Sequence, residues 1–155
     1  GLAEQPLGAV VTASGNLEPS LRYFSGRPPV VLTSEARATA LQARLDGRAT
    51  VVGVGGDTVD LRAAMGVLRR RFGVRTLLCE GGPRLAHGLI AGGLADELFL
   101  TLAPKLGSDS GALRLLDGPR FVPPDVPELT LIHILHHEGE LFLRYSLQAE
   151  QRSSG

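Results

Sequence analysis

The apolar residues of this chain follow two different periods along its length. Runs rich in valine, leucine and threonine predict strands at residues 9–12, 30–33, 50–54, 74–79 and 97–102. The residues between these runs repeat at helical spacing, most clearly at Leu61, Ala64, Met65, Leu68 and Phe72. This alternation predicts an α/β fold in which a mostly parallel sheet carries helices on both faces, a three-layer α-β-α arrangement.

Polar residues and glycines mark where the predicted helices begin and end. Ser34 is expected to cap the first helix, and Asp57 or Thr58 the second. Gly47 and Gly73 are expected to end these helices, because glycine adopts the left-handed conformation that follows a helix. A third, shorter helix is predicted at residues 84–91.

The C-terminal part of the chain has a different pattern. Residues 129–136 and 141–147 are predicted strands, and the short glycine-containing connection between them favours an antiparallel hairpin at one edge of the sheet. The proline-rich residues 119–127 cannot form a central strand or a helix interior, so they are predicted to be a surface loop.

Composition narrows the class of protein. The 155 residues suit one domain, and 16 basic residues balance 16 acidic ones, which argues against a nucleic acid or a membrane as partner. Cys79 is the only cysteine, so no intrachain disulfide forms and a cytoplasmic location is expected. Residues 1–6 lack a signal-peptide pattern, and no apolar run reaches the roughly 18 residues of a membrane span.

The strongest candidate for a ligand site lies at residues 77–85. Gly81 and Gly82 fall between a predicted strand and a predicted helix, where free backbone N–H groups and the helix dipole favour phosphate. Pro83 suits the first helical position, and Glu80 precedes the glycines, where its carboxylate could bind a second, polar ligand. The alternative is a tight turn that requires glycine for its backbone alone.

A second candidate follows the strand at residues 30–33. The hydroxyls of Thr33 and Ser34, with Arg37 nearby, could hold the 2′-phosphate of NADPH and so favour it over NADH. Glu35 opposes this interpretation because it carries a like charge. An ordinary serine cap explains the same residues.

Two other predicted strand ends supply further candidates. Thr12 ends the first strand and could line the same crevice. Val54 belongs to the glycine-rich turn at residues 53–58, which either lies beside a ligand or is purely structural. The carboxyl ends of parallel strands meet at one edge of a sheet, where ligands of α/β proteins commonly bind.

The other polar residues give weaker signals. The histidines at positions 133, 136 and 137 lack the spacing of a zinc site, and no metal is expected. His87, on the helix after the glycine pair, could face the ligand, but a surface histidine is the expectation favoured here. No motif for nucleophilic catalysis is present.

Two segments together carry a resemblance to a known family. Residues 77–85, with their Glu-Gly-Gly-Pro motif, are followed by residues 93–107, which contain Gly-Leu-Ala-Asp-Glu and later Pro-Lys-Leu-Gly. This combination resembles the reductase domain of riboflavin biosynthesis, which is the C-terminal domain of bacterial bifunctional deaminase-reductases and occurs alone in pyrimidine reductases. The resemblance implies a dihydrofolate-reductase-like fold and extends less sharply over residues 8–147.

The resemblance also implies a function. The expected reaction is the NADPH-dependent reduction of 5-amino-6-(5-phosphoribosylamino)uracil, or a related ribosylaminopyrimidine, by a homodimer. Glu80 would contact this small-molecule substrate. The residues expected to bind NADPH are Gly81, Gly82, Pro83, Arg84, Leu85, Thr12, Thr33, Ser34 and Val54. The hydride chemistry belongs to the cofactor, and the protein supplies orientation and electrostatics.

One departure from the family limits these expectations. Members carry a central strand, a helix and several substrate-binding groups before the strand that matches residues 9–12. We therefore expect residues 1–155 to form a single reductase-like domain that lacks its N-terminal strand and helix. The alternatives are a non-catalytic fragment that binds a dinucleotide or dimerises, and an enzyme of the dihydrofolate reductase type.

Overall fold

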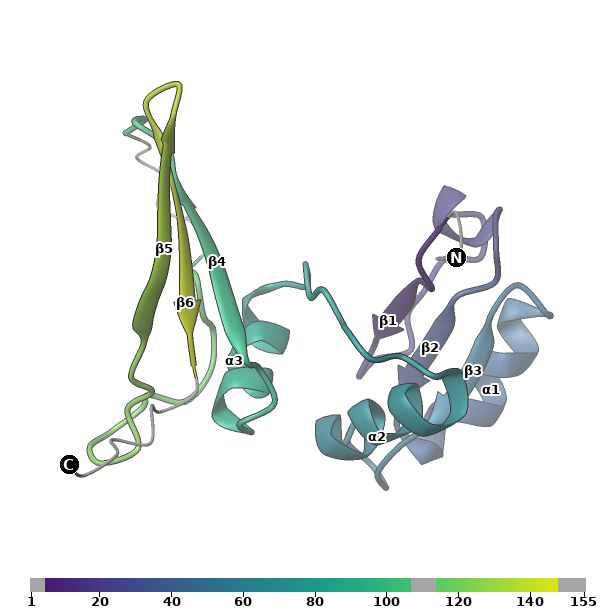
Figure 1. The fold of residues 1–155 in the computed structure, drawn as a ribbon. Helices are drawn as coiled ribbons and strands as arrows, with labels where there is room; N and C mark the ends of the chain where they lie inside the picture. Colours follow the sequence, from purple (N-terminus) through teal and green to yellow (C-terminus); the bar gives the residue numbers. More distant parts are fainter. Residues whose placement is uncertain (1–4, 107–113, 148–155) are drawn as a thin grey trace. The chain divides into compact units, whose positions relative to one another are not determined.

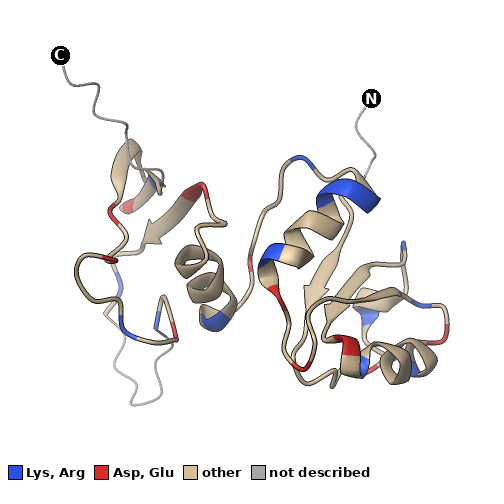
Figure 2. Cartoon of the chain, turned by 90° about the horizontal axis from the view of Figure 1, so that it is seen from below, with Lys and Arg blue, Asp and Glu red and all other residues tan. Residues whose placement is uncertain are grey.

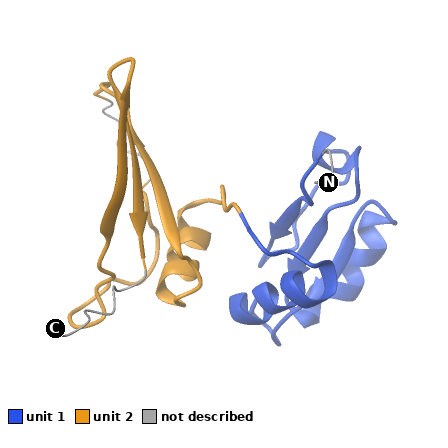
Figure 3. Ribbon diagram, viewed as in Figure 1, with its two compact units in different colours: residues 1–77 blue, residues 78–155 orange. Residues whose placement is uncertain are grey.

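The β-branched run Val30–Thr33 forms β2, the central strand of a three-stranded parallel sheet (Figure 1). The flanking strands are β1 (Ala9–Val11) and β3 (Thr50–Gly53), in the order β1-β2-β3. All four residues of β2 are buried, as expected for a strand covered on both faces. This computed structural model describes residues 5–106 and 114–147 and divides the chain into two units, residues 1–77 and 78–155 (Figure 3).

Helices cover both faces of the parallel sheet. Leu41 and Leu45 of α1 (Glu35–Leu45) pack with Val31 on one face, where Phe24 of the short helix η1 (Arg22–Phe24) joins them. Leu68 of α2 (Leu61–Phe72) packs with Leu32 on the other face. Successive strand residues point to opposite faces, so each face has its own apolar cluster. The predicted three layers are confirmed for this unit.

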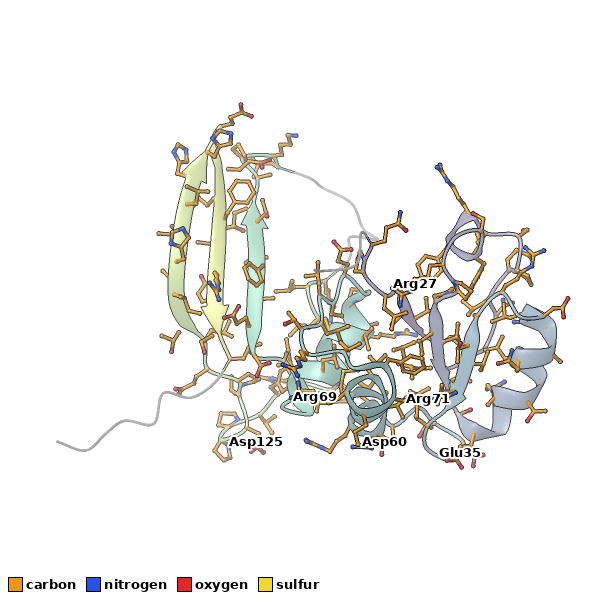
Figure 4. The ribbon with its side chains drawn as sticks, turned by 45° about the vertical axis from the view of Figure 1, so that its right-hand side comes forward. Arg27, Glu35, Asp60, Arg69, Arg71 and Asp125 are labelled. Carbon is orange, nitrogen blue, oxygen red and sulfur yellow. The ribbon has the colours of Figure 1, made fainter. Side chains whose placement is uncertain are left out.

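The start of α2 differs from the prediction. Asp60, labelled in Figure 4, is the N-cap, and its side chain accepts a hydrogen bond of 2.9 Å from the backbone N–H of Ala63. The predicted caps Asp57 and Thr58 are therefore wrong, because the turn at Gly55 brings the chain back before the helix starts. Gly73 ends α2 in the left-handed conformation, as predicted.

Removing this cap is expected to destabilise the first unit. Asp60→Ala leaves a backbone N–H of the first turn of α2 without its partner, and we expect a loss of about 1 kcal/mol in the free energy of unfolding. Urea titration followed by circular dichroism measures this loss. Asp57→Ala removes a nearby exposed carboxylate that caps nothing, and an equal loss in this control would contradict the role of Asp60.

The second unit contains an antiparallel sheet. Its strands are β4 (Glu97–Leu102), β5 (Thr130–His137) and β6 (Glu140–Ser146), in the order β4-β6-β5, and it also contains α3 (Pro83–Ala91). The predicted C-terminal hairpin is confirmed. The pairing of β4 and the place of the hairpin differ from the prediction, because among the described residues β4 pairs antiparallel with β6 and neither pairs with a parallel strand.

Side-chain contacts accompany the backbone pairing of β4 with β6. The Arg144 guanidinium of β6 donates from Nε and Nη2 to the two carboxylate oxygens of Glu97, at 3.0 and 2.5 Å. It also lies over the ring of Phe99, directly across the strand pair. The hydrogen bond to Glu97 raises the pKa of Arg144 further above its already high ordinary value. A bidentate contact of this kind favours the observed strand register over registers shifted along the strand.

The predicted strand at residues 74–79 is wrong. These residues connect α2 to α3 as a coil, and no strand among the described residues pairs with them. An apolar run becomes a strand only when a neighbour accepts its backbone hydrogen bonds. The side chains of Leu77 and Leu78 are accordingly exposed, with relative accessibilities of 44% and 74%.

The second unit buries little of its apolar surface. Among its described residues, only Leu89 and Leu143 are buried hydrophobic residues. The apolar side chains on β4, β5 and β6 that stay exposed are Phe99, Leu102, Leu131, Ile132, Ile134, Leu135 and Phe142. Acidic and basic residues are interspersed in both units (Figure 2). No helix of the described part is long and apolar enough to cross a membrane.

Candidate functional site

The predicted residues of the first unit meet at the carboxyl ends of the parallel strands. Thr12 follows β1, Thr33 ends β2 and Val54 follows β3. The Thr33 hydroxyl donates to the Thr12 carbonyl at 2.8 Å, and the Val54 N–H donates to the Thr33 carbonyl at 2.8 Å. The Thr12 hydroxyl accepts from the N–H of Gly15 at 3.0 Å. These hydrogen bonds tie the three strand ends into one rim.

Ser34 begins α1 but does not cap it through its side chain. The first two N–H groups of α1 instead donate to backbone carbonyls, Glu35 to Gly55 at 2.9 Å and Ala36 to Gly56 at 3.3 Å. The expectation that the Ser34 side chain caps the helix is therefore wrong. Its hydroxyl is fully buried, and it has no hydrogen-bond partner among the described residues. A buried hydroxyl without a partner is costly, which makes Ser34 a candidate for a ligand contact.

The glycine-rich turn after β3 has a structural role that its sequence left open. Gly55 has a φ of +77°, and a Cβ at this position would lie 2.5 Å from the Thr58 carbonyl oxygen. At Gly53, a Cβ would lie 2.9 Å from the Cα of Glu35. Glycine is thus required for the close approach that lets this turn cap α1.

The loop after β1 is held by arginines on and just after α1. Arg37 donates to the Ser14 carbonyl at 3.5 Å, Arg44 to the Gly15 carbonyl, and Arg48 to the Pro19 carbonyl at 3.4 Å. The sequence suggested Arg37 as a partner of a 2′-phosphate, and the structure shows it at the backbone of this loop. Ala13 and Ser14, at the tip of the rim, are exposed.

The second group of predicted residues surrounds the start of α3. Gly82 is the N-cap, with φ −65° and ψ 171°, and Pro83 occupies the first helical turn, as predicted. A Cβ placed on Gly82 meets nothing within 4 Å, so space lies open in front of this helix start. At Gly81, a Cβ would lie 2.7 Å from the Leu85 side chain, which packs against this glycine.

The start of α3 presents donors and a carboxylate. Among the described residues, the backbone N–H groups of Arg84 and Leu85 have no partner, as is usual in the first turn of a helix. Proline lacks an N–H, so these two groups are the donors that follow Gly82. Glu80 is exposed two residues before the helix cap and pairs with no described side chain. This arrangement suits an anion at the helix and a polar ligand at the acid.

The structure adds a contact that the sequence did not predict. The Arg84 guanidinium donates from Nε to the Asp117 carboxylate at 2.8 Å. Asp117 is 33 residues away along the chain, so no local spacing could have revealed the pair. His87 is half-buried and contacts Pro119 and Phe121, whereas the sequence indicated a surface histidine. No group of three or more potential metal ligands occurs in residues 5–106 and 114–147.

The parallel strands with polar carboxyl ends, followed by an antiparallel hairpin, place this chain in the class of α/β proteins with the dihydrofolate-reductase-like fold. The chain belongs to the RibD C-terminal domain family, whose sequence model matches residues 2–142. The predicted resemblance is thereby confirmed. Gly107, part of the second motif, lies outside the described residues.

Two relatives with names from the same pathway match parts of this chain. The chain is 32% identical over 116 residues to the 2,5-diamino-6-ribosylamino-4(3H)-pyrimidinone 5′-phosphate reductase of Methanothermobacter thermautotrophicus, which covers 74% of this chain and 53% of the relative. It is 39% identical over 64 residues to the riboflavin biosynthesis protein RibD of Escherichia coli, covering 41% of this chain and 17% of the relative. The chain thus spans about half of the first relative and a smaller part of the second.

Solved structures show the same fold. RibD of Acinetobacter baumannii matches with a TM-score of 0.74 at 19% identity, over 92% of this chain and 38% of the other. A pyrimidine reductase-like protein of Corynebacterium diphtheriae matches with a TM-score of 0.74 at 22% identity, over 91% and 60%. The riboflavin biosynthesis reductase Rib7 of Saccharomyces cerevisiae gives 0.69 at 14% identity, over 93% and 70%.

Proposed function

We propose that this chain carries out the NADPH-dependent reduction of a ribosylaminopyrimidine phosphate in riboflavin biosynthesis, with 5-amino-6-(5-phosphoribosylamino)uracil or its 2,5-diamino relative as substrate. Family membership and the name of the archaeal relative support this reaction class. The observation that carries the proposal is the juxtaposition of an exposed carboxylate, Glu80, with an open Gly-Gly-Pro helix start.

Each group, taken by itself, has features that suit a phosphate or hydroxyl group of a dinucleotide cofactor. The open space at Gly82, the free N–H groups of the first turn of α3 and the Arg84 guanidinium suit a pyrophosphate. At the rim of the first unit, the Ser34 hydroxyl has no hydrogen-bond partner among the described residues, and a ligand could supply one. Thr12, Thr33 and Val54 are buried and hold the rim in shape. When bound, NADPH would supply the hydride that reduces the ribose to a ribitol chain.

Glu80 is proposed to bind the substrate and not the cofactor. A carboxylate accepts hydrogen bonds from hydroxyl or amino groups, which the ribosylaminopyrimidine has in abundance. Glu80→Gln keeps the size of the side chain and removes its charge. We expect this variant to reduce kcat/KM about 10- to 100-fold, the loss that accompanies removal of a charged hydrogen-bonding group, while the Kd of NADPH changes less than about twofold.

The test has two stages. NADPH binding is followed by fluorescence, and the ribosylaminopyrimidine is then added while the absorbance of the reduced nicotinamide is recorded. Glu138→Gln, which removes a carboxylate from the exposed β5–β6 turn, serves as the matched control. NADPH binding without oxidation would instead favour a non-catalytic dinucleotide-binding module, and oxidation with dihydrofolate alone would favour a dihydrofolate reductase.

Unpaired strand edges indicate where a further strand of the domain could pair. Among the described residues, β1 pairs only with β2, and β4 pairs only with β6. β4 has no bulge and no proline to protect its outer edge, whereas β5 carries a register shift between Leu131 and His133. These edges support the proposal that residues 1–155 belong to one reductase-like domain to which a further strand and helix contribute.

The exposed apolar residues of the second unit support a homodimer. The antiparallel sheet exposes phenylalanine, leucine and isoleucine side chains on more than one strand, as do surfaces that associate with a partner. We therefore propose that two copies associate and that the protein acts in the cytoplasm. The single cysteine suits such a reducing compartment.

A further inference from the structure

A short segment after residue 114 attaches to α3 through several independent contacts. We call residues 117–121 the α3 strap. The Asp117 carboxylate accepts from Arg84 Nε at 2.8 Å, and the Asp117 backbone N–H donates to the Pro83 carbonyl at 3.2 Å. One turn further along the helix, His87 Nε2 donates to the Pro119 carbonyl at 2.8 Å. The strap is thus fixed to the first half of α3.

Aromatic packing secures the far end of the strap. The rings of His87 and Phe121 stack at 4.7 Å between centroids, with their planes 19° apart. Gly118 passes so close to His87 that an added Cβ would lie 2.4 Å from Nδ1. Only a residue without a side chain lets the strap lie this close to the helix. The backbone around Asp117 is therefore held by contacts that do not involve the Arg84 side chain.

The contact between Asp117 and Arg84 uses one of the five N–H donors of the guanidinium. The carboxylate accepts from Nε, and no other hydrogen bond or ion pair of the guanidinium occurs among the described residues, so the four N–H groups on the two Nη atoms remain available. The Arg84 side chain is 86% exposed. An ion pair this exposed contributes little to folding stability, so stability alone does not explain the arrangement.

The contact of Arg84 with Asp117 has two opposite effects on the binding of an anion by Arg84. A free arginine loses rotamer freedom when it binds phosphate, and an arginine that already has a fixed partner loses less. The carboxylate also repels an approaching phosphate, but solvent and salt screen that repulsion at an exposed site. The donors on the two Nη atoms remain available for a bidentate contact with a phosphate, in the plane that the contact with Asp117 fixes.

Resting on the proposed function, we propose that Asp117 is a positioning residue for the cofactor: it holds Arg84 at the start of α3 so that the guanidinium binds a dinucleotide phosphate. The α3 strap keeps Asp117 in place through the His87 contacts. The cofactor affinity of the chain is therefore coupled to a loop segment that itself contacts no phosphate.

A double-mutant cycle tests this role in the full chain. Asp117→Ala is expected to raise the Kd of NADPH about three- to fivefold, the range for an exposed ion pair, and to leave kcat unchanged. In the Arg84→Ala background, the same substitution is expected to have no further effect. Asp125→Ala removes a carboxylate from the neighbouring loop with the same change in net charge, and its Kd is expected to equal that of the unsubstituted protein (Asp125 is labelled in Figure 4).

A second variant separates position from charge. Gly118→Ala leaves every charge in place, but its Cβ clashes with the His87 ring, so the strap or that ring must shift and the contacts between them are disturbed. We expect Gly118→Ala to raise the Kd of NADPH, as Asp117→Ala does. Asp117→Asn keeps an acceptor for Nε, so we expect its Kd to lie between that of the unsubstituted protein and that of Asp117→Ala. Tighter NADPH binding by Asp117→Ala, or an equal effect with and without Arg84, would overturn the positioning role alone. No NADPH binding by the unsubstituted protein would overturn the cofactor assignment and this role together.

Discussion

Gly55→Ala is expected to lower the free energy of unfolding by about 3 kcal/mol. Roughly 1 kcal/mol comes from the left-handed backbone that alanine adopts poorly, and about 2 kcal/mol comes from overpacking. The overpacking arises because the new Cβ would lie 2.5 Å from the Thr58 carbonyl oxygen and 2.9 Å from the Asp60 nitrogen, both rigid backbone atoms. The damage spreads to α1 and α2, because this turn caps the first helix and leads into the second.

Gly56→Ala is the matched control for this substitution. Gly56 is the next residue of the same turn, and a Cβ placed on it meets nothing within 4 Å. Chemical denaturation measures the free energy of unfolding of both variants. The difference between them reports the effect of the backbone conformation and close contacts at Gly55, because both variants add one methyl group. Equal stability of the two variants would show that the turn at Gly55 relaxes freely and does not constrain the rim.

Gly82→Val is expected to weaken NADPH binding at least about tenfold, which corresponds to about 1.4 kcal/mol. The fold provides open space for the valine side chain, and the extended backbone at Gly82 suits any residue. The branched side chain would therefore occupy the volume in front of α3 where the proposed pyrophosphate lies. Fluorescence titration with NADPH measures the change.

The fold itself is expected to tolerate this valine. Valine is a poorer helix cap than glycine, so the free energy of unfolding falls by no more than about 1 kcal/mol. Gly26→Val, in an open turn of the first unit, is the control for adding an exposed branched side chain. Unchanged affinity in Gly82→Val would contradict the assignment of the pyrophosphate to α3.

The elements that the sequence predicted well are those whose structure depends on residues close together along the chain. The helical stripe from Leu61 to Phe72 coincides with α2, and the β-branched run at residues 30–33 coincides with β2. Pairing was less predictable because it depends on distant residues. The run at residues 74–79 has the composition of a strand but no partner among the described residues, and β4 pairs with β6 through a contact between Glu97 and Arg144.

The same distinction applies to the candidate site. The rule that parallel strands share a carboxyl edge predicted that Thr12, Thr33 and Val54 would lie together, and they do. The sequence could not show that the Thr33 hydroxyl bonds to the backbone or that the Ser34 hydroxyl is left without a partner, because both depend on side-chain rotamers in a packed environment. Asp117 was missed because a loop brings it to α3.

The rim that joins the three parallel strand ends bears on the thermodynamics of recognition. Its backbone groups bond to one another across β1, β2 and β3, and arginines fasten the adjoining loop. A ligand that contacts this rim meets a surface whose conformational entropy was already lost when the chain folded. Its binding enthalpy then reflects contacts alone, without a contribution from coupled folding of the receptor. Calorimetry would detect this as a small heat-capacity change that arises only from the area the ligand covers.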